Sequence, residues 1–202
     1  MDTATHFENR EDWLAWRRGG VGSSDASAVM GACKWSGRTE KILEKLGLID
    51  GYVRKPWEWR AMEKGRRLEP EARSSYEAWM GIQMTPANIL HPEYSELRAS
   101  CDGLNKDAGR VLEIKCPGKE AHAIAMSGKI PDYYFWQCVH LLMVSGMDWL
   151  DYYSFDEETR IGKAVCLKRD LKLEKRLMEM ELEFWAEVQK YQVPSNVIPF
   201  RR

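Results

Sequence analysis

The segment LEIK at residues 112–115 carries an acid and an amine two positions apart. Alternate side chains of a β-strand point to opposite faces, so Glu113 and Lys115 share one face and the two apolar residues share the other. Asp102 precedes this segment across a turn-rich stretch, and a hairpin would bring its carboxylate next to Glu113. Two neighbouring carboxylates repel each other unless a divalent cation lies between them. With the Ile114 carbonyl as a third oxygen, the pattern predicts a site for Mg²⁺ or Mn²⁺ rather than zinc.

Lys115 has a specific use beside such a cation. It can position or help to deprotonate a water nucleophile, and it can stabilise the negative charge that grows during attack on a phosphodiester. The alternative is an ordinary exposed strand face with an ion pair within the chain, which is the commoner meaning of an isolated acid-x-Lys pattern. The two residues alone leave both interpretations open.

A second candidate site lies near the N-terminus, where a glycine-rich turn leads into a short helix at residues 24–30. The first N–H groups of a helix lie at its positive end and can bind phosphate. Ser24 adds a hydroxyl, and Arg17 or Arg18 adds a guanidinium that can bind phosphate oxygens in pairs. The alternative is simple N-capping by Ser23 or Ser24, in which case Asp25 only stabilises the first turn.

Five segments in this order resemble the YqaJ-type viral recombinases, the lambda-exonuclease-like branch of the PD-(D/E)XK nucleases. They are RRGGVGSSD at 17–25, GRRLEPEAR at 65–73, SCDGL at 100–104, LEIKCP at 112–117 and YFWQ at 134–137. The similarity runs from about residue 13 to residue 145. The order of all five segments is far more specific than any single one.

The resemblance implies a role for each matching residue. Asp102, Glu113 and the Ile114 carbonyl match the primary metal ligands, and Glu69 matches the acid that completes a second metal site. Lys115 matches the catalytic lysine, and Gln137 matches a glutamine that holds water or active-site groups. The chain departs from the family in two places, with Val139 where a second glutamine is frequent and Cys101 where a proline usually precedes the aspartate.

We therefore expect a Mg²⁺- or Mn²⁺-dependent exonuclease that degrades linear double-stranded DNA, with two ions per site. By resemblance, Arg17, Arg18 and Ser24 would recognise a 5′-phosphate, and degradation would run 5′ to 3′ and leave 3′ single strands. The resemblance also implies a ring-shaped homotrimer around DNA, a single-strand annealing protein as partner and a phage or prophage origin. The alternatives are an endonuclease of the same superfamily and a non-catalytic DNA-binding or assembly module with a nuclease fold.

Hydrophobic periodicity indicates the elements that position these residues. Helices are expected at residues 11–18, 24–30, 39–46 and 58–80, with a bend or restart beside Pro70. Two strands at 96–101 and 110–115 follow, then helices at 119–127 and 132–144, strands at 149–155 and 164–168, and a final helix opened by Asp170. This order predicts an α/β or α+β fold of the restriction-endonuclease type, with a mixed central sheet flanked by helices and a helical N-terminal part.

Composition sets the remaining limits. The 202 residues favour a single domain over 1–202, with the motifs at 13–145 and the last strands and helix at 146–202. A net charge of −1 excludes a polybasic protein that binds nucleic acid by overall charge. One local basic excess, at residues 54–73, is a candidate DNA-tracking surface. No apolar run is long enough to span a bilayer, and five scattered cysteines fit no disulfide framework, so we expect a cytoplasmic protein without a membrane partner.

Overall fold

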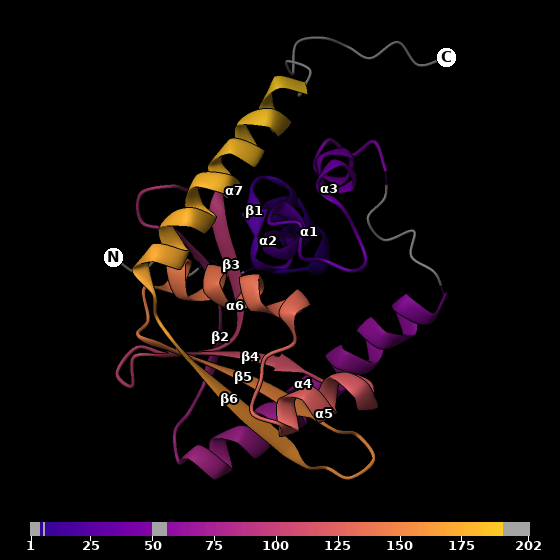
Figure 1. Cartoon of the computed structure of the whole chain (residues 1–202), viewed down its shortest axis with the longest axis vertical. Coiled ribbons are helices and arrows are strands. Elements are labelled where there is room, and N and C mark those ends of the chain that lie inside the picture. Colours follow the sequence, from indigo (N-terminus) through magenta and orange to yellow (C-terminus); the bar gives the residue numbers. More distant parts are fainter. Residues whose placement is uncertain (1–4, 6, 50–55, 192–202) are drawn as a thin grey trace.

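The computed structural model describes residue 5, residues 7–49 and residues 56–191. Among these residues, six strands form one mixed sheet, with helices on both of its faces (Figure 1). The helices are α1 (Arg10–Arg18), α2 (Ser23–Val29), α3 (Arg38–Lys45), α4 (Pro56–Met80), α5 (Lys119–Met126), α6 (Asp132–Ser145) and α7 (Leu171–Tyr191). The strands are β1 (Val21–Gly22), β2 (Thr85–Leu90), β3 (Leu97–Asn105), β4 (Arg110–Lys115), β5 (Trp149–Phe155) and β6 (Gly162–Lys168). The expected mixed α/β fold is confirmed.

Strand β3 organises the sheet because it pairs with three other strands. Strand β2 runs antiparallel along one edge of β3, from Leu90↔Arg98 to Thr85↔Leu104. On the other edge, β1 pairs in parallel at Leu97 and Arg98, and β4 pairs antiparallel from Gly103 to Asn105. Strand β4 then pairs in parallel with β5, and β5 pairs antiparallel with β6. Between its pairings with β1 and β4, the edge of β3 is open at residues 99–102.

The two faces of the sheet bury two separate apolar clusters. The larger cluster joins Val111 of β4 to helices α2, α6 and α7, where Leu177 and Phe184 are fully buried. The smaller cluster joins Leu112 and Ile114 to helix α4. The alternation expected for β4 is therefore confirmed, and it leaves Glu113 on the α6 side of the sheet.

Several expected boundaries differ from the structure. Strand β3 ends at Asn105, so Asp102 lies inside it rather than at its end. Helix α4 continues through Pro70 as one element and does not restart. The sequence pattern also missed β1 and β2. The latter contains Pro86, which a strand tolerates at an edge position because no sheet partner there needs its N–H.

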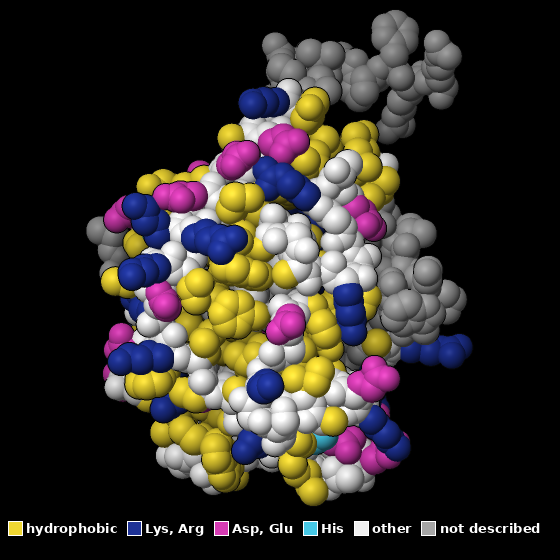
Figure 2. Space-filling view, viewed as in Figure 1, with side chains coloured by type: hydrophobic (Ala, Val, Ile, Leu, Met, Phe, Trp, Pro, Cys, Tyr) yellow, Lys and Arg dark blue, Asp and Glu magenta, His cyan; other side chains and the backbone are white. Residues whose placement is uncertain are grey.

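Charged side chains of both signs are interspersed over the face shown in Figure 2 and form no single-sign block there. Within the described part of the chain, no helix is long and apolar enough to cross a membrane.

Candidate active site

The candidate site begins where β3 and β4 separate. The pairing that starts at Asn105↔Arg110, next to the turn, ends at Gly103↔Leu112. Beyond this pair, the Ile114 N–H no longer has a β3 carbonyl to bind. The Asp102 carboxylate fills this place, since its Oδ2 accepts that N–H at 2.7 Å. A Cβ at Gly103 would lie 2.7 Å from the Cβ of Met84, so glycine next to Asp102 allows β3 to pack closely against Met84.

Glu113 is the most deeply buried charged residue of the site, at 2% exposure. Its Oε1 accepts hydrogen bonds from Gln137 Nε2 of α6 at 2.6 Å and lies 2.5 Å from Lys115 Nζ. Burial alone would lower the pKa of Lys115, but the Glu113 carboxylate outweighs it and raises that pKa above the usual value. The Lys115 ammonium also lies 5.0 Å from the ring centre of Tyr134. The Lys115 ammonium and the Gln137 amide thus both contact the buried Glu113 carboxylate.

Glu69 enters the site from α4, on the other side of Asp102. Its carboxylate pairs with Arg73 one turn later, and Arg73 Nε also donates to the Asp102 carbonyl at 2.7 Å. Burial raises the pKa of Glu69, and the nearby Glu113 carboxylate adds to this although Arg73 opposes it. Burial, followed by Glu113 and Glu69, holds the pKa of Asp102 well above its ordinary value. The three carboxyl groups are therefore close enough to repel one another.

This donor set fits an oxygen-preferring divalent cation. No three His, Cys, Asp or Glu side chains of the described residues already form a ready set of metal ligands. Instead, cationic side chains hold two of the acids, with Lys115 on Glu113 and Arg73 on Glu69. Crowded carboxyls that already require positive charge are the chemical setting in which Mg²⁺ or Mn²⁺ binds.

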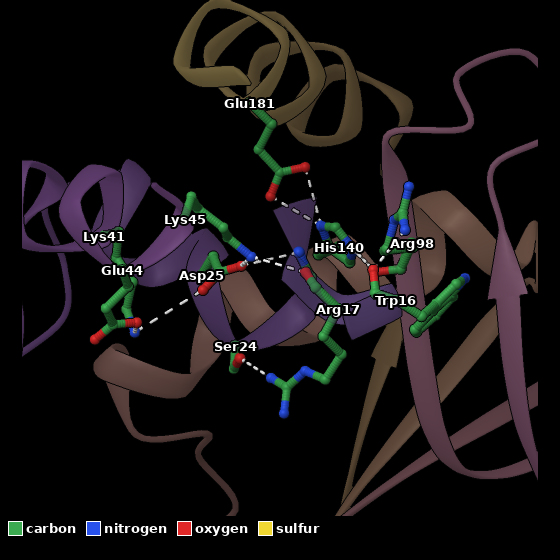
Figure 3. A network of polar contacts seen from close by, with 11 residues as sticks. Trp16, Arg17, Ser24, Asp25, Lys41, Glu44, Lys45, Arg98, His140 and Glu181 are labelled. Carbon is green, nitrogen blue, oxygen red and sulfur yellow. Dashed lines mark hydrogen bonds and ion pairs between the residues drawn. The ribbon is translucent and has the colours of Figure 1, made fainter. Parts of the chain in front are cut away.

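Two of the N-terminal candidates, Arg17 and Ser24, lie together in a network of polar contacts (Figure 3). Arg17 Nη2 donates to Ser24 Oγ at 2.5 Å, and the Arg17 guanidinium lies 4.6 Å from the ring centre of Trp13. Lys45 Nζ donates to the Arg17 carbonyl at 3.1 Å. Arg18 is exposed. The structure thus identifies Arg17 as the arginine that contacts Ser24.

Helix α2 begins differently from the expectation. Its N-cap is Gly22 rather than Ser23 or Ser24, and the Gly22 N–H donates to Asp25 Oδ2 at 3.0 Å, so that N–H is already bound. Asp25 is itself buried, and its Oδ2 lies 2.7 Å from Lys45 Nζ. Burial would raise the pKa of Asp25, but Lys45 and Lys41 hold it below its usual range. The two lysines offset the negative charge of the Asp25 carboxylate, so Asp25 does not repel an anion beside Arg17.

One cleft of about 1130 Å³ brings both candidate sites together. All nine residues named from the sequence line it: Arg17, Arg18, Ser24, Glu69, Asp102, Glu113, Ile114, Lys115 and Gln137. Within the described residues, ten lysines and arginines line this cleft against five acids. The cleft is therefore basic although the whole chain is nearly neutral.

The expected DNA-tracking surface divides into parts. Lys64 and Arg66 line the cleft, whereas Arg73 binds Glu69 and the Asp102 backbone inside the site. Residues 54 and 55 lie outside the described residues. The sequence analysis missed this anchoring role of Arg73, although its position four residues after Glu69 on a helix was an available signal. It also missed Tyr134, which lies against Lys115.

This chain is similar to known proteins in sequence and in fold. The family model "YqaJ-like viral recombinase domain" matches residues 12–148. The YqaJ protein of Bacillus subtilis (strain 168) is 28% identical over 183 residues, which cover 88% of this chain and 56% of that protein, so the chain spans just over half the length of this curated relative.

Solved structures show the same likeness. The alkaline exonuclease LHK-Exo from Laribacter hongkongensis is 29% identical, with a TM-score of 0.76 over 90% of this chain and 93% of that one. Its complex with dAMP gives a TM-score of 0.77 at the same identity and coverage. A phage related exonuclease from Haemophilus somnus 129PT shares the fold at 15% identity and a TM-score of 0.63, over 85% of this chain and 92% of that one. The match of the family model over most of the chain shows that this protein belongs to the family of YqaJ-like viral recombinase domains.

Proposed function

We propose that this protein is a metal-dependent deoxyribonuclease, with Mg²⁺ or Mn²⁺ as its cofactor and two ions in each site. The observation that carries the proposal is the convergence of Asp102, Glu113 and Lys115 with Glu69 and Gln137 in one basic cleft. The family's description and the likeness to an alkaline exonuclease support a nuclease that acts on DNA.

The residues of the site would have three roles, which are cation binding, stabilisation of negative charge and orientation of the Glu113 carboxylate. Asp102, Glu113 and the Ile114 carbonyl would hold one cation, and Glu69 would help to hold the second. When bound, such ions supply Lewis-acid stabilisation of the negative charge in phosphodiester hydrolysis. The Lys115 ammonium donates to the phosphate oxygens as that charge grows, and Gln137 keeps the Glu113 carboxylate oriented.

We further propose that the enzyme starts at linear double-stranded DNA ends and proceeds 5′ to 3′, with Arg17 and Ser24 on the terminal phosphate and Arg18 beside them. The 3′ single strands would pass to a single-strand annealing protein. A ring-shaped homotrimer, a bacterial cytoplasmic location and a phage or prophage origin complete the proposal. The contact of Arg17 with Ser24 and the family's description as viral recombinases support it.

The test compares variants on linear and closed circular duplexes, in Mg²⁺ and in chelator. We expect wild type to degrade only linear DNA and only with metal. Glu113→Gln should abolish the activity, and Lys115→Ala should lower kcat by about 100-fold or more. The control is Lys119→Ala, because Lys119 is an exposed lysine of the same region that pairs with Glu158. A Glu113→Gln protein as active as wild type would refute the metal-site proposal, and cleavage of circles would refute end dependence.

A second pair of variants tests the terminal phosphate. Arg17→Ala should remove the preference for 5′-phosphorylated over 5′-hydroxyl ends, whereas Arg18→Ala should keep it. Equal rates on both ends with the wild-type protein would remove the role given to Arg17 and Ser24.

A further inference from the structure

An aromatic cluster lies on the wall of the same cleft and has no part in the proposed chemistry. Trp35 contacts Tyr133 edge-on at 4.9 Å between ring centres and lies 5.7 Å from the Tyr134 ring. Lys34 Nζ lies 3.9 Å from the Tyr133 ring centre and 4.9 Å from that of Trp35. We call these four residues the Trp35 platform. Trp35 is 42% exposed and lines the cleft.

The platform is fixed in place by one residue of α2. The Ser27 carbonyl accepts the N–H groups of Ala32 at 2.7 Å and Cys33 at 3.0 Å, which holds the loop that carries Lys34 and Trp35. The Ser27 hydroxyl donates to the Tyr133 carbonyl at 2.8 Å, which holds the start of α6. Both halves of the platform therefore attach to the same helix. A loop fixed in this way loses little conformational entropy when a ligand binds to it.

The platform is also connected to both phosphate-directed groups of the cleft. Tyr134, which contacts Trp35, is the ring that lies against the Lys115 ammonium. On the other side, α2 carries Ser24, the partner of Arg17, one turn before Ser27. A strand with one phosphate at Lys115 and another at Arg17 would lie in the cleft that Trp35 also lines.

We propose that the Trp35 platform binds a nucleobase of the strand being degraded, by stacking on the exposed Trp35 ring. This inference rests on the proposed nuclease function and adds a base-binding subsite to it. Stacking on an aromatic ring suits any base, because every base has a π-face, so the subsite would hold the strand without reading its sequence.

The charges of the cleft favour a nucleotide over an apolar peptide as the occupant. The lining has twice as many basic as acidic residues within the described part of the chain, so it attracts a polyanion. Lys34 places an ammonium directly at the stacking surface. A peptide side chain would cover that charge without an anionic partner, whereas a nucleotide brings its own phosphate.

The test uses duplexes with 2-aminopurine as the base, placed either near the 5′ end of the degraded strand or near the 3′ end of the opposite strand. Binding is measured with Ca²⁺ in place of Mg²⁺, and KM and kcat are measured with Mg²⁺ on unlabelled DNA. We expect wild type to quench the fluorescence of the 5′ probe. Trp35→Ala should lose the quenching and raise KM by about tenfold. Trp35→Phe should keep most of the quenching and a KM close to that of wild type. The control is Trp79→Ala, because Trp79 is an exposed tryptophan that does not line the cleft.

Each outcome has one meaning. If Trp35→Ala is folded by circular dichroism and matches wild type in quenching and KM, the subsite does not exist. Trp35-dependent quenching of the 3′ probe alone would overturn the assignment to the degraded strand. A wild-type protein that binds both duplexes but degrades neither in Mg²⁺ would refute the proposed nuclease, and that result is separate from the quenching data.

Discussion

At the scale of single residues, the site depends on one oxygen atom. Oε1 of Glu113 is contacted by both Lys115 and Gln137, and these two residues come from different elements. Two donors on one oxygen fix the plane of the carboxylate and therefore the direction in which it can bind a cation. Partners of this kind, which orient a ligand without touching the metal, typically change metal affinity or activity by about 10- to 100-fold when removed.

Gln137→Ala should therefore lower kcat by about 10- to 100-fold and raise the Mg²⁺ concentration needed for half-maximal rate, with little change in KM for DNA. The measurement is a metal titration of nuclease activity at saturating DNA. The matched control is Gln83→Ala, an exposed glutamine outside the cleft. Unchanged kcat and metal dependence in Gln137→Ala would show that Gln137 does not orient Glu113.

At the scale of elements, the sequence predicts what depends on local periodicity and misses what depends on partners. The alternation of β4 and the final helix after Asp170 are local patterns, and both are confirmed. Strand β1 has only two residues, and its pairing with β3 creates it, so no pattern within it could reveal it. The extension of β3 past Asp102 likewise depends on the pairing of residues 103–105 with β4.

The same distinction applies to the candidate site. All nine residues named from the sequence line the cleft, because each motif that named them is short and local. The contacts of Arg73 with Glu69 and with the Asp102 carbonyl depend on how α4 packs against the sheet, which no motif records. The placement of the Trp35 loop depends in the same way on its hydrogen bonds to Ser27.

Helices α6 and α7 are joined by a buried contact between His140 and Glu181 (Figure 3), and we expect this contact to make folding stability depend on pH. His140 Nδ1 lies 2.8 Å from Glu181 Oε1, and its Nε2 lies 3.0 Å from the Arg98 carbonyl of β3. Burial lowers the pKa of His140, but Glu181, with smaller help from Asp25 on α2, outweighs it and raises that pKa above 6.5. The folded protein therefore binds this proton more tightly than the unfolded chain does.

A raised histidine pKa stabilises the fold fully below the unfolded value near 6.5, and this contribution is lost as the pH rises through the folded pKa. We expect the free energy of unfolding of wild type, from urea titrations, to fall as the pH rises above about 6.5. Glu181→Gln should flatten this decrease, because the neutral amide no longer favours the imidazolium. His122→Gln, a change at a histidine of α5 outside this pair, should leave it intact. An equally steep decrease in Glu181→Gln would show that the pair does not cause it.

At the scale of the whole molecule, net charge is a poor guide to what the protein binds. The chain has 30 basic and 31 acidic residues, yet its cleft has a basic excess within the described residues. The acids that balance it lie elsewhere, in surfaces of mixed sign such as the one in Figure 2. Attraction of DNA is therefore expected to depend on a few lysine and arginine side chains of the cleft rather than on overall charge.

Because the basic side chains of the cleft attract the DNA, the Kd for DNA should depend measurably on salt concentration. Each phosphate contact made by a lysine or arginine releases about one counterion, so log Kd should change linearly with log salt. Arg66 lies on the exposed part of the cleft wall, and Arg66→Ala should lower that slope by about 1 while weakening binding to all sequences alike. Lys168→Ala removes an equal charge beside Trp149, away from this cleft, and should leave the slope unchanged. If both variants shift the slope equally, overall charge rather than the cleft governs DNA binding.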